Sequence, residues 1–347
     1  MAGNITIAVA GATGAVGREL LRVLEQRNFP AANVKALASS RSAGVKLPFA
    51  GGELTVEELT DTSFEGVHLA LFSAGGATSE KFAPIAARSG CVVVDNSNAW
   101  RMDDRCPLVV PEVNREALKN HNGIIANPNC STIQMLVALY PLHKVAGIKR
   151  IIVSTYQAVS GTGQKAIAEL EAQVRQMFNL QEPEVNVYPH RIAFNCLPQI
   201  DIFLENDYTK EEMKMVRETV KIFADPSVKV SATCVRVPVF YGHSESVNVE
   251  FAKPISPKEA RAILSVAPGV QLLDNPDQKI YPMPIDAAGE DPVFVGRIRA
   301  DESQANTLNM WVVADNIRKG AALNAVQIAE CLLEDGLLGV KDKKAFS

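Results

Sequence analysis

Short apolar runs alternate with amphipathic segments along the first part of the chain. The runs cover residues 4–10, 34–38, 67–73, 91–95, 108–111 and 123–126. Each predicts a buried strand, and leucines and valines at helical spacing up to about Arg27 predict a helix after the first one. Strands and helices that alternate in this order are typical of a Rossmann-like α/β domain with a parallel sheet.

The pattern changes after residue 128. Long runs rich in Val, Ile and Thr cover residues 150–160, 228–239 and 246–251, and they predict an antiparallel or mixed sheet with helices on one face. Residues 208–220 predict a helix that Thr209 and Glu212 cap. An amphipathic helix from Gly320 to Leu338 is expected to pack back on the first domain. The predicted domains are residues 1–128 with 320–347, and residues 129–319.

Composition narrows the class of protein. A chain of 347 residues with 47% hydrophobic content suits two folded domains. A net charge of -4, a pI near 5.8 and the lack of a basic run argue against nucleic-acid binding. No apolar stretch approaches the ~18 residues that span a bilayer, so we expect no membrane partner and a cytoplasmic location.

The cysteines predict neither a disulfide framework nor a metal site. They lie at positions 91, 106, 130, 196, 234 and 331. They form no Cys-x-x-Cys pair and have no histidine at ligand spacing, so reduced thiols are expected.

A glycine turn follows the first strand. Gly11, Gly14 and Gly17 stand between that strand and a helix, where a dinucleotide-binding turn lets the backbone approach a pyrophosphate. Their spacing differs from the common Gly-x-Gly-x-x-Gly pattern, so an ordinary tight turn is the alternative. The flanking strand and helix favour nucleotide binding.

The end of the second strand bears on cofactor choice. An NAD-binding fold usually offers an acidic residue there to the ribose 2′-hydroxyl, but this chain has none. Arg41 and the serines at 39, 40 and 42 supply a cation and hydroxyls instead, which suit a 2′-phosphate. NADP is therefore favoured over NAD, and a solvated surface arginine is the alternative.

Cys130 is the candidate nucleophile. A short strand ends at Asn127-Pro128, and Asn129 can cap a helix whose apolar positions continue to Leu139. A thiol in the first turn of a helix faces unpaired N–H groups and the positive end of the helix dipole, which favours the thiolate. The alternative is a buried core cysteine, because free cysteines are among the most buried residues.

Other polar positions have less specific patterns. His243, in a glycine-flanked polar loop, is a candidate acid/base, with a surface histidine as the alternative. Arg236 lies among valines and must find a partner or a ligand carboxylate. Arg101 follows a strand at its carboxyl end, where α/β sheets bind ligands. Glu211 and Lys214 are spaced like an ordinary helix-surface ion pair.

Three partial motifs are rejected. Tyr140 and Lys144 have the spacing of the short-chain dehydrogenase pair, but Pro141 marks a helix end or kink there. Residues 242–246 lack the last glycine of a nucleophile elbow. Residues 161–165 lack the Gly-Lys-Ser/Thr of a phosphate loop.

Seven ordered motifs together carry a family resemblance. They are Gly-Ala-Thr-Gly-Ala-Val-Gly at 11–17, Leu-Ala-Ser-Ser-Arg-Ser-Ala-Gly at 37–44, Phe-Ser-Ala-Gly-Gly at 72–76, Pro-Asn-Cys-Ser-Thr at 128–132, Ser-Thr-Tyr-Gln-Ala-Val-Ser-Gly at 154–161, Glu-Glu-Met-Lys at 211–214, and Cys-Val-Arg-Val-Pro-Val through Gly-His-Ser-Glu-Ser at 234–246. On these motifs the chain resembles the aspartate-β-semialdehyde dehydrogenase family almost end to end.

The resemblance implies that NADPH reduces L-aspartyl-4-phosphate to the semialdehyde and phosphate, in lysine (diaminopimelate), methionine and threonine biosynthesis. It implies a thioester at Cys130, acid/base action by His243 and orientation by Gln157. It further implies substrate and phosphate contacts at Arg101, Glu211, Lys214 and Arg236. The implied NADP contacts are Gly11, Thr13, Gly14, Ala15, Val16, Arg41, Ser42, Ser160, Gly161 and Asn316. A homodimer through the second domain is also implied.

Two alternatives remain at this point. N-acetyl-γ-glutamyl-phosphate reductase shares the thiol mechanism, although the context of Arg236 and of Glu211 with Lys214 favours an aspartyl substrate. A catalytically idle NADP-binding sensor is the alternative outside enzymes, and the joint presence of Cys130, Gln157, Arg236 and His243 argues against it.

Overall fold

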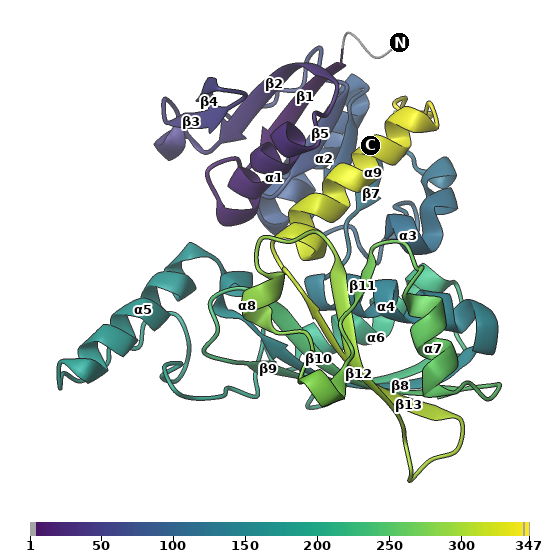
Figure 1. The fold of residues 1–347 in the computed structure, drawn as a ribbon. Helices are drawn as coiled ribbons and strands as arrows, with labels where there is room; N and C mark the ends of the chain where they lie inside the picture. Colours follow the sequence, from purple (N-terminus) through teal and green to yellow (C-terminus); the bar gives the residue numbers. More distant parts are fainter. Residues whose placement is uncertain (1–4, 343, 347) are drawn as a thin grey trace. The chain divides into compact units, whose positions relative to one another are not determined.

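The computed structural model describes residues 5–342 and 344–346 (Figure 1). The chain divides into two compact units. One unit runs to Asn129 and resumes at Ala321, and the other runs from Cys130 to Gly320. No described helix is both long and apolar enough to cross a membrane.

The first unit is built on a seven-stranded sheet of order β3-β4-β2-β1-β5-β6-β7. Its strands are β1 (Ile5–Ala10), β2 (Ala31–Ala38), β3 (Lys46–Phe49), β4 (Gly52–Glu58), β5 (Leu69–Phe72), β6 (Val92–Asp95) and β7 (Ile124–Ala126). All paired neighbours are parallel except β3 and β4. Because β1 lies between β2 and β5, its carboxyl end is at the topological switch point where such sheets bind ligands.

Helices cover both faces of this sheet (Figure 1). The helices are α1 (Ala15–Gln26), α2 (Gly76–Ser89) and α9 (Leu323–Glu334), together with the short α3 (Pro111–Asn114) and the 3-10 turns η1 (Ser40–Ser42) and η2 (Arg115–Asn120). Ile7 and Val9 of β1 pack with α1 and α9, whereas Ala8 and Ala10 pack with α2. This alternation confirms a central strand covered on both faces and a C-terminal helix that returns to the first domain.

The second unit is built on a six-stranded sheet of order β11-β12-β13-β10-β8-β9. Its strands are β8 (Ile148–Gln157), β9 (Lys229–Arg236), β10 (His243–Phe251), β11 (Val270–Leu272), β12 (Val293–Ala300) and β13 (Thr307–Ala314). The pairs β8-β9 and β11-β12 are parallel, and the other neighbours are antiparallel, so the predicted mixed sheet is confirmed.

Three helices lie on one face of the second sheet, namely α4 (Cys130–Ala146), α6 (Lys210–Phe223) and α7 (Pro257–Leu264) (Figure 1). The short α8 (Pro284–Ala287) contacts β13 beside Phe294 and Trp311. The 3-10 turn η3 (Val159–Thr162) follows β8 and leads into α5 (Gln164–Phe178), and a π turn at Arg318–Ala322 precedes α9.

Some local predictions are confirmed and others are wrong. Thr209 and Glu212 form the predicted capping box of α6. Residues 108–111 form no strand: Leu108 makes a single bridge to β7, and Pro111 already begins α3. Helix α4 continues past Pro141 to Ala146, so a helix end at Pro141 is wrong, whereas the alternative of a kink there stays a prediction. It also has no single apolar face, because residues 131–139 are all buried.

Candidate functional site

The glycine turn of the first unit closes β1 onto its two neighbouring strands. The N–H of Gly11 donates to the carbonyl of Leu37 in β2 at 2.8 Å. A Cβ on Gly11 would lie 2.4 Å from the Ser73 carbonyl, and one on Gly17 would lie 2.1 Å from the Gly11 carbonyl. Both glycines are therefore required by packing of backbone against backbone.

Gly14 differs from the other two glycines. It is exposed, its φ of -73° suits any residue, and a Cβ there would meet only the Gly11 carbonyl at 3.4 Å. It stands at the N-cap of α1, where no side chain caps the helix and no acidic residue lies in the first turn. Helical N–H groups without a side-chain cap are typical binding groups for the pyrophosphate of a dinucleotide.

The other predicted cofactor contacts of this unit surround the same turn. Thr13, Ala15 and Val16 are half-buried at the start of α1. Arg41 and Ser42 lie in η1, directly after β2, with Arg41 exposed. Arg41 makes no ion pair with another described residue.

Arg101 is buried in the first unit. Its Nε donates to the Asn127 carbonyl and its Nη2 to the Asn96 carbonyl, both at 2.9 Å. Asn127 stands three residues before Cys130 in the chain. Arg101 therefore fixes the backbone that leads to the thiol, which is a positioning contact in addition to its predicted phosphate contact.

In the second unit, Cys130 is the first residue of α4, as predicted. Its side chain is partly exposed, so a simple buried core cysteine is excluded. Gln157, the last residue of β8, is buried and directs its Nε2 to Cys130 Sγ at 4.0 Å and to Glu211 Oε1 at 3.1 Å. Thr155 Oγ1 donates to the Gln157 Oε1 at 3.3 Å, so the amide is held from both ends.

Glu211 and Lys214 are not the surface ion pair that their spacing alone predicts. Glu211 is only 5% exposed, and Lys214 Nζ contacts both Glu211 Oε2 and Asp201 Oδ2 at 2.9 Å. Burial lowers the pKa of Lys214, but the two carboxylates outweigh it, and the net shift is upward. Lys214 therefore stays a cation between Glu211 and Asp201.

One peptide group joins Arg236 and His243. The Ala158 N–H donates to His243 Nδ1 at 3.0 Å, and the Ala158 carbonyl accepts from Arg236 Nη1 at 2.6 Å. Because Nδ1 accepts a hydrogen bond, the proton of the neutral imidazole is on Nε2. Arg236 Nε and His243 Nε2 are both buried and have no partner among the described residues, so each can meet a ligand.

His243 is neutral at physiological pH. It is the first residue of β10 and fully buried, so the predicted polar loop and the surface-histidine alternative are both wrong. Burial, followed by the charge of Arg236, lowers the pKa of His243 to about 3, although Glu211 opposes the shift. In this state the ring offers a hydrogen-bond donor, Nε2–H, rather than a positive charge.

Ser160, Gly161 and Asn316 lie on the same side of the second unit. Asn316 Oδ1 accepts from Ser160 Oγ and from the Gly242 N–H, both at 3.1 Å. A Cβ on Gly161 would stand 3.0 Å from Arg236 Nη1 and 3.1 Å from His243 Nε2. Gly161 thus keeps space open beside the two side chains that point into the site.

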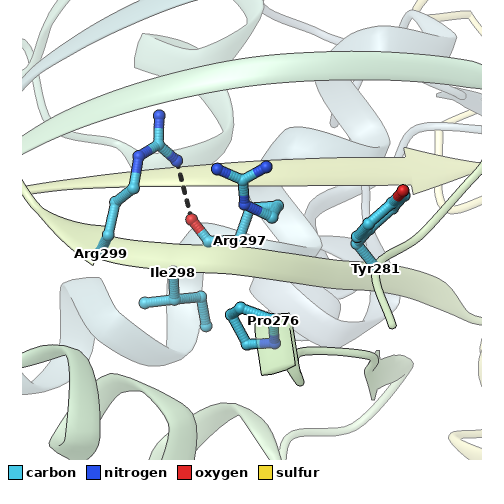
Figure 2. A pocket seen from close by; sticks show the side chains of 5 residues that line it. All are labelled: Pro276, Tyr281, Arg297, Ile298 and Arg299. Carbon is cyan, nitrogen blue, oxygen red and sulfur yellow. Dashed lines mark hydrogen bonds between the residues drawn. The ribbon is translucent and has the colours of Figure 1, made fainter. Parts of the chain in front are cut away.

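A separate pocket of about 190 Å³ lies along β12 and is lined by Pro276, Tyr281, Arg297, Ile298 and Arg299. Figure 2 shows both guanidinium groups on one side of the strand, with Ile298 and Pro276 on the other. Arg299 Nη1 donates to the Arg297 carbonyl at 2.8 Å. None of the predicted site residues lines this pocket.

The structure adds polar groups that the motifs did not indicate. Asp201 forms an ion pair with Lys214, although the two residues are thirteen positions apart in the chain. The backbone N–H and carbonyl of Ala158 bind His243 and Arg236. Gly320 packs so closely on Cys130 that a Cβ there would lie 2.8 Å from the Cys130 Cβ. Sequence spacing gives no signal for any of these contacts.

Comparison with known proteins defines the class first. The family model described as "Semialdehyde dehydrogenase, NAD binding domain" matches residues 6–121, and the one described as "Semialdehyde dehydrogenase, dimerisation domain" matches residues 139–319. The two matches define the chain as a semialdehyde dehydrogenase with an NAD-binding domain and a dimerisation domain. An aspartate-semialdehyde dehydrogenase of Aquifex aeolicus (strain VF5) is 60% identical over 336 residues, which cover 96% of this chain and 99% of the relative. The chain belongs to the aspartate-semialdehyde dehydrogenase family.

Solved structures agree with this assignment. The crystal structure of aspartate semialdehyde dehydrogenase II complexed with ASA from Vibrio cholerae has a TM-score of 0.94 and 52% identity, with 96% of this chain and 99% of that chain covered. Aspartate semialdehyde dehydrogenase with NADP from Candida albicans has a TM-score of 0.76 and 26% identity, with 96% and 100% covered. Fold and family together establish an α/β enzyme with a nicotinamide dinucleotide domain and a dimerisation domain.

Proposed function

We propose that this protein reduces L-aspartyl-4-phosphate to L-aspartate 4-semialdehyde and phosphate, with NADPH as the reductant and a thioester on Cys130 as the intermediate. Relatives that are 52–60% identical over nearly their whole length are named aspartate-semialdehyde dehydrogenases. Within the second unit, the observation that carries the proposal is the Gln157 amide, which contacts both Cys130 Sγ and the Glu211 carboxylate.

In the proposed reaction, the thiolate of Cys130 attacks the acyl carbon, and the bond from that carbon to the phosphate oxygen breaks. The attack places negative charge on the carbonyl oxygen of a tetrahedral intermediate. Gln157 Nε2 and His243 Nε2–H are the two donors proposed to stabilise that charge. When bound, NADPH supplies the hydride that converts the thioester to the aldehyde.

Arg236 is the proposed contact for the α-carboxylate of the substrate. Its Nη1 is already bound to the Ala158 carbonyl, which fixes the plane of the guanidinium, while Nε remains without a partner among the described residues. A planar cation fixed in this way suits a carboxylate better than a flexible lysine would. Glu211 is proposed to accept from the substrate ammonium group.

Lys214 and Arg101 are the proposed phosphate contacts. Lys214 keeps its positive charge because Glu211 and Asp201 lie against it. The guanidinium of Arg101 has a fixed orientation, because it donates to the Asn96 and Asn127 carbonyls. Both cations would stabilise the leaving phosphate in this proposal.

NADP is the proposed cofactor, in preference to NAD. The support is the exposed Arg41 beside Ser42, the lack of an acid at the end of β2, and the name of the Candida albicans relative, which contains NADP. Ser160, Gly161 and Asn316 are the proposed contacts from the second unit.

A homodimer through the second unit is part of the proposal. The family model names this unit a dimerisation domain. The sheet face opposite α4, α6 and α7 carries Tyr156 and Trp311 in contact at 5.3 Å between ring centroids, with Tyr281 and Met283 exposed nearby. A partly apolar face of this kind suits a second copy of the chain.

The direct test is the reverse assay, in which aspartate semialdehyde reduces NADP in the presence or absence of phosphate or arsenate. We expect turnover only when one of these anions is present, because the thioester must be transferred to it. N-acetylglutamate semialdehyde is the control substrate and should react slowly. An equal rate without either anion would overturn the phosphorylating reaction.

A further inference from the structure

Glu245 is a fully buried carboxyl group to which the proposed reaction assigns no role. It is the third residue of β10, and its side chain has no solvent exposure. Neither carboxyl oxygen receives a hydrogen bond of good geometry from another described residue. A carboxylate buried in this way would cost far more free energy than the neutral acid.

Among the described residues, no cation contributes to the pKa shift of Glu245. Thr155 of β8 lies opposite it in the sheet, and its hydroxyl donates to Gln157 instead. The thiol of Cys234, on β9, has its pKa raised by burial and then by nearby carboxyl groups that include Glu245. His243 on the same strand is neutral. Burial therefore raises the pKa of Glu245 well above its ordinary value.

Gln134 of α4 is a further neighbour: a hydrogen bond from its side chain to the Glu245 carboxylate lowers the pKa of Glu245, but the effect of burial is larger. Its Nε2 is directed to the backbone carbonyl of His243 at 3.2 Å. Its Oε1 is buried and receives no hydrogen bond from the described residues. The amide oxygen of Gln134 and the carboxylate oxygens of Glu245 are all hydrogen-bond acceptors without a donor of good geometry among the described residues. A proton on Glu245 would supply a donor.

We propose that Glu245 is a positioning residue held as the neutral acid, and that its O–H donates to Gln134 Oε1 to tie α4 to β10. This hydrogen bond gives Gln134 Oε1 a donor and gives one of the two Glu245 oxygens a partner. Gln134 stands four residues after Cys130, one turn along the same helix, while its Nε2 binds the residue that carries the imidazole. The Glu245–Gln134 pair therefore sets the position of the thiol relative to His243.

The first test compares Glu245→Gln with Glu245→Met, and its kinetic readout rests on the proposed function. Glutamine is neutral and can donate to Gln134 Oε1, so Glu245→Gln should keep kcat within about threefold of the parent. Methionine fills the space without a donor, so kcat should fall about 10- to 100-fold with little change in KM, as expected for a small misplacement of reacting groups. Equal impairment of both variants would overturn the proposal, since it would show that a neutral hydrogen-bond donor at this position does not preserve activity.

A second test does not depend on which reaction the enzyme catalyses. At a pH above the pKa of an unfolded glutamate, the parent protein takes up a proton at Glu245 when it folds. The Glu245→Gln variant takes up no proton at this position. Relative to that variant, the unfolding equilibrium constant of the parent should rise about tenfold per pH unit above pH ~4.5, up to the folded pKa. A difference that does not vary with pH would overturn the proposal. Glu250→Gln, at a part-exposed position on the same strand that pairs with Lys149, is the matched control for the loss of a carboxylate from β10.

A double-mutant cycle assigns the partner. Gln134→Leu should reduce kcat about as much as Glu245→Met, and the double variant should be no worse than either single one. Additive losses would show that the two side chains act separately and would overturn the pairing. If aspartate semialdehyde proved not to be a substrate, the pH slope of stability would still decide the protonation of Glu245.

Discussion

The glycine turn of the first unit and the cysteine site of the second unit are built in opposite ways. The turn depends on absent side chains: Gly11 and Gly17 allow backbone to touch backbone, and Gly14 leaves the helical N–H groups open. The cysteine site depends on polar side chains from α4, α6, β8, β9 and β10: Gln157 contacts Cys130 and Glu211, and the Ala158 peptide group holds Arg236 and His243.

This difference decides how each region responds to change. The glycine turn, which is built from backbone contacts, tolerates no added side-chain atom at Gly11 or Gly17. It does not depend on the protonation state of any side chain. A site of buried polar side chains tolerates small changes of volume, but it depends on the protonation state of each member. The following predictions use this contrast.

The largest effect is expected at Gly17. Its Cβ would overlap the Gly11 carbonyl, so Gly17→Ala should destabilise the first unit by more than about 3 kcal/mol in urea unfolding. Gly14→Ala is the matched control, and it should unfold like the parent but bind NADP more weakly. Normal stability of Gly17→Ala would contradict the account of the turn.

Arg236→Lys should lower kcat/KM for the aspartyl substrate about 10- to 100-fold. Lysine keeps the charge but loses the planar hydrogen bonds to the Ala158 carbonyl and to a carboxylate, each worth about 1.5–3 kcal/mol. Steady-state kinetics measure the loss, and NADP affinity by fluorescence titration should not change. Full activity would remove Arg236 from substrate binding.

His243 should make the protein acid-sensitive. Its pKa is lowered to about 3 in the folded state, whereas an unfolded histidine titrates near 6.5. The unfolded state therefore binds the extra proton between these values, and stability falls as the pH drops from about 6.5 toward 3, by up to ~1.4 kcal/mol per pH unit. Chemical unfolding at several pH values should show a shallower slope for His243→Gln. Parallel slopes would indicate that His243 titrates normally.

The smallest effect is expected at Arg41. Arg41→Ala should weaken NADP binding about tenfold and leave NAD binding nearly unchanged, because only NADP has the 2′-phosphate. Parallel titrations with the two cofactors measure this ratio. Equal weakening of both would remove Arg41 from cofactor choice.

The two regions also differ in how far their sequence predicts them. The strand, the glycine turn and the helix are consecutive, so spacing alone predicts residues 5–26 well, and the capping box at Thr209 is equally local. The β3-β4 hairpin was not predicted, since most of its residues are exposed and carry no clear apolar pattern.

The second region is assembled by tertiary contacts that no local pattern records. His243 was predicted in a loop because the apolar alternation becomes visible only at Val247, although the strand begins with buried polar residues. Glu211 has the spacing of a surface residue, and only the docking of α6 against β9 buries it. The family resemblance supplied the expected roles of these residues, and the geometry supplies physical reasons for them.

The central claim is that the reaction passes through an acyl group on Cys130, and mass spectrometry of the enzyme tests it directly. The enzyme is mixed with aspartate semialdehyde and NADP without phosphate, quenched in acid and digested. We predict an added aspartyl group on the peptide that contains Cys130, lost on addition of phosphate and never formed in Cys130→Ala. An active enzyme that carries no such group, or carries it on another residue, would contradict the account.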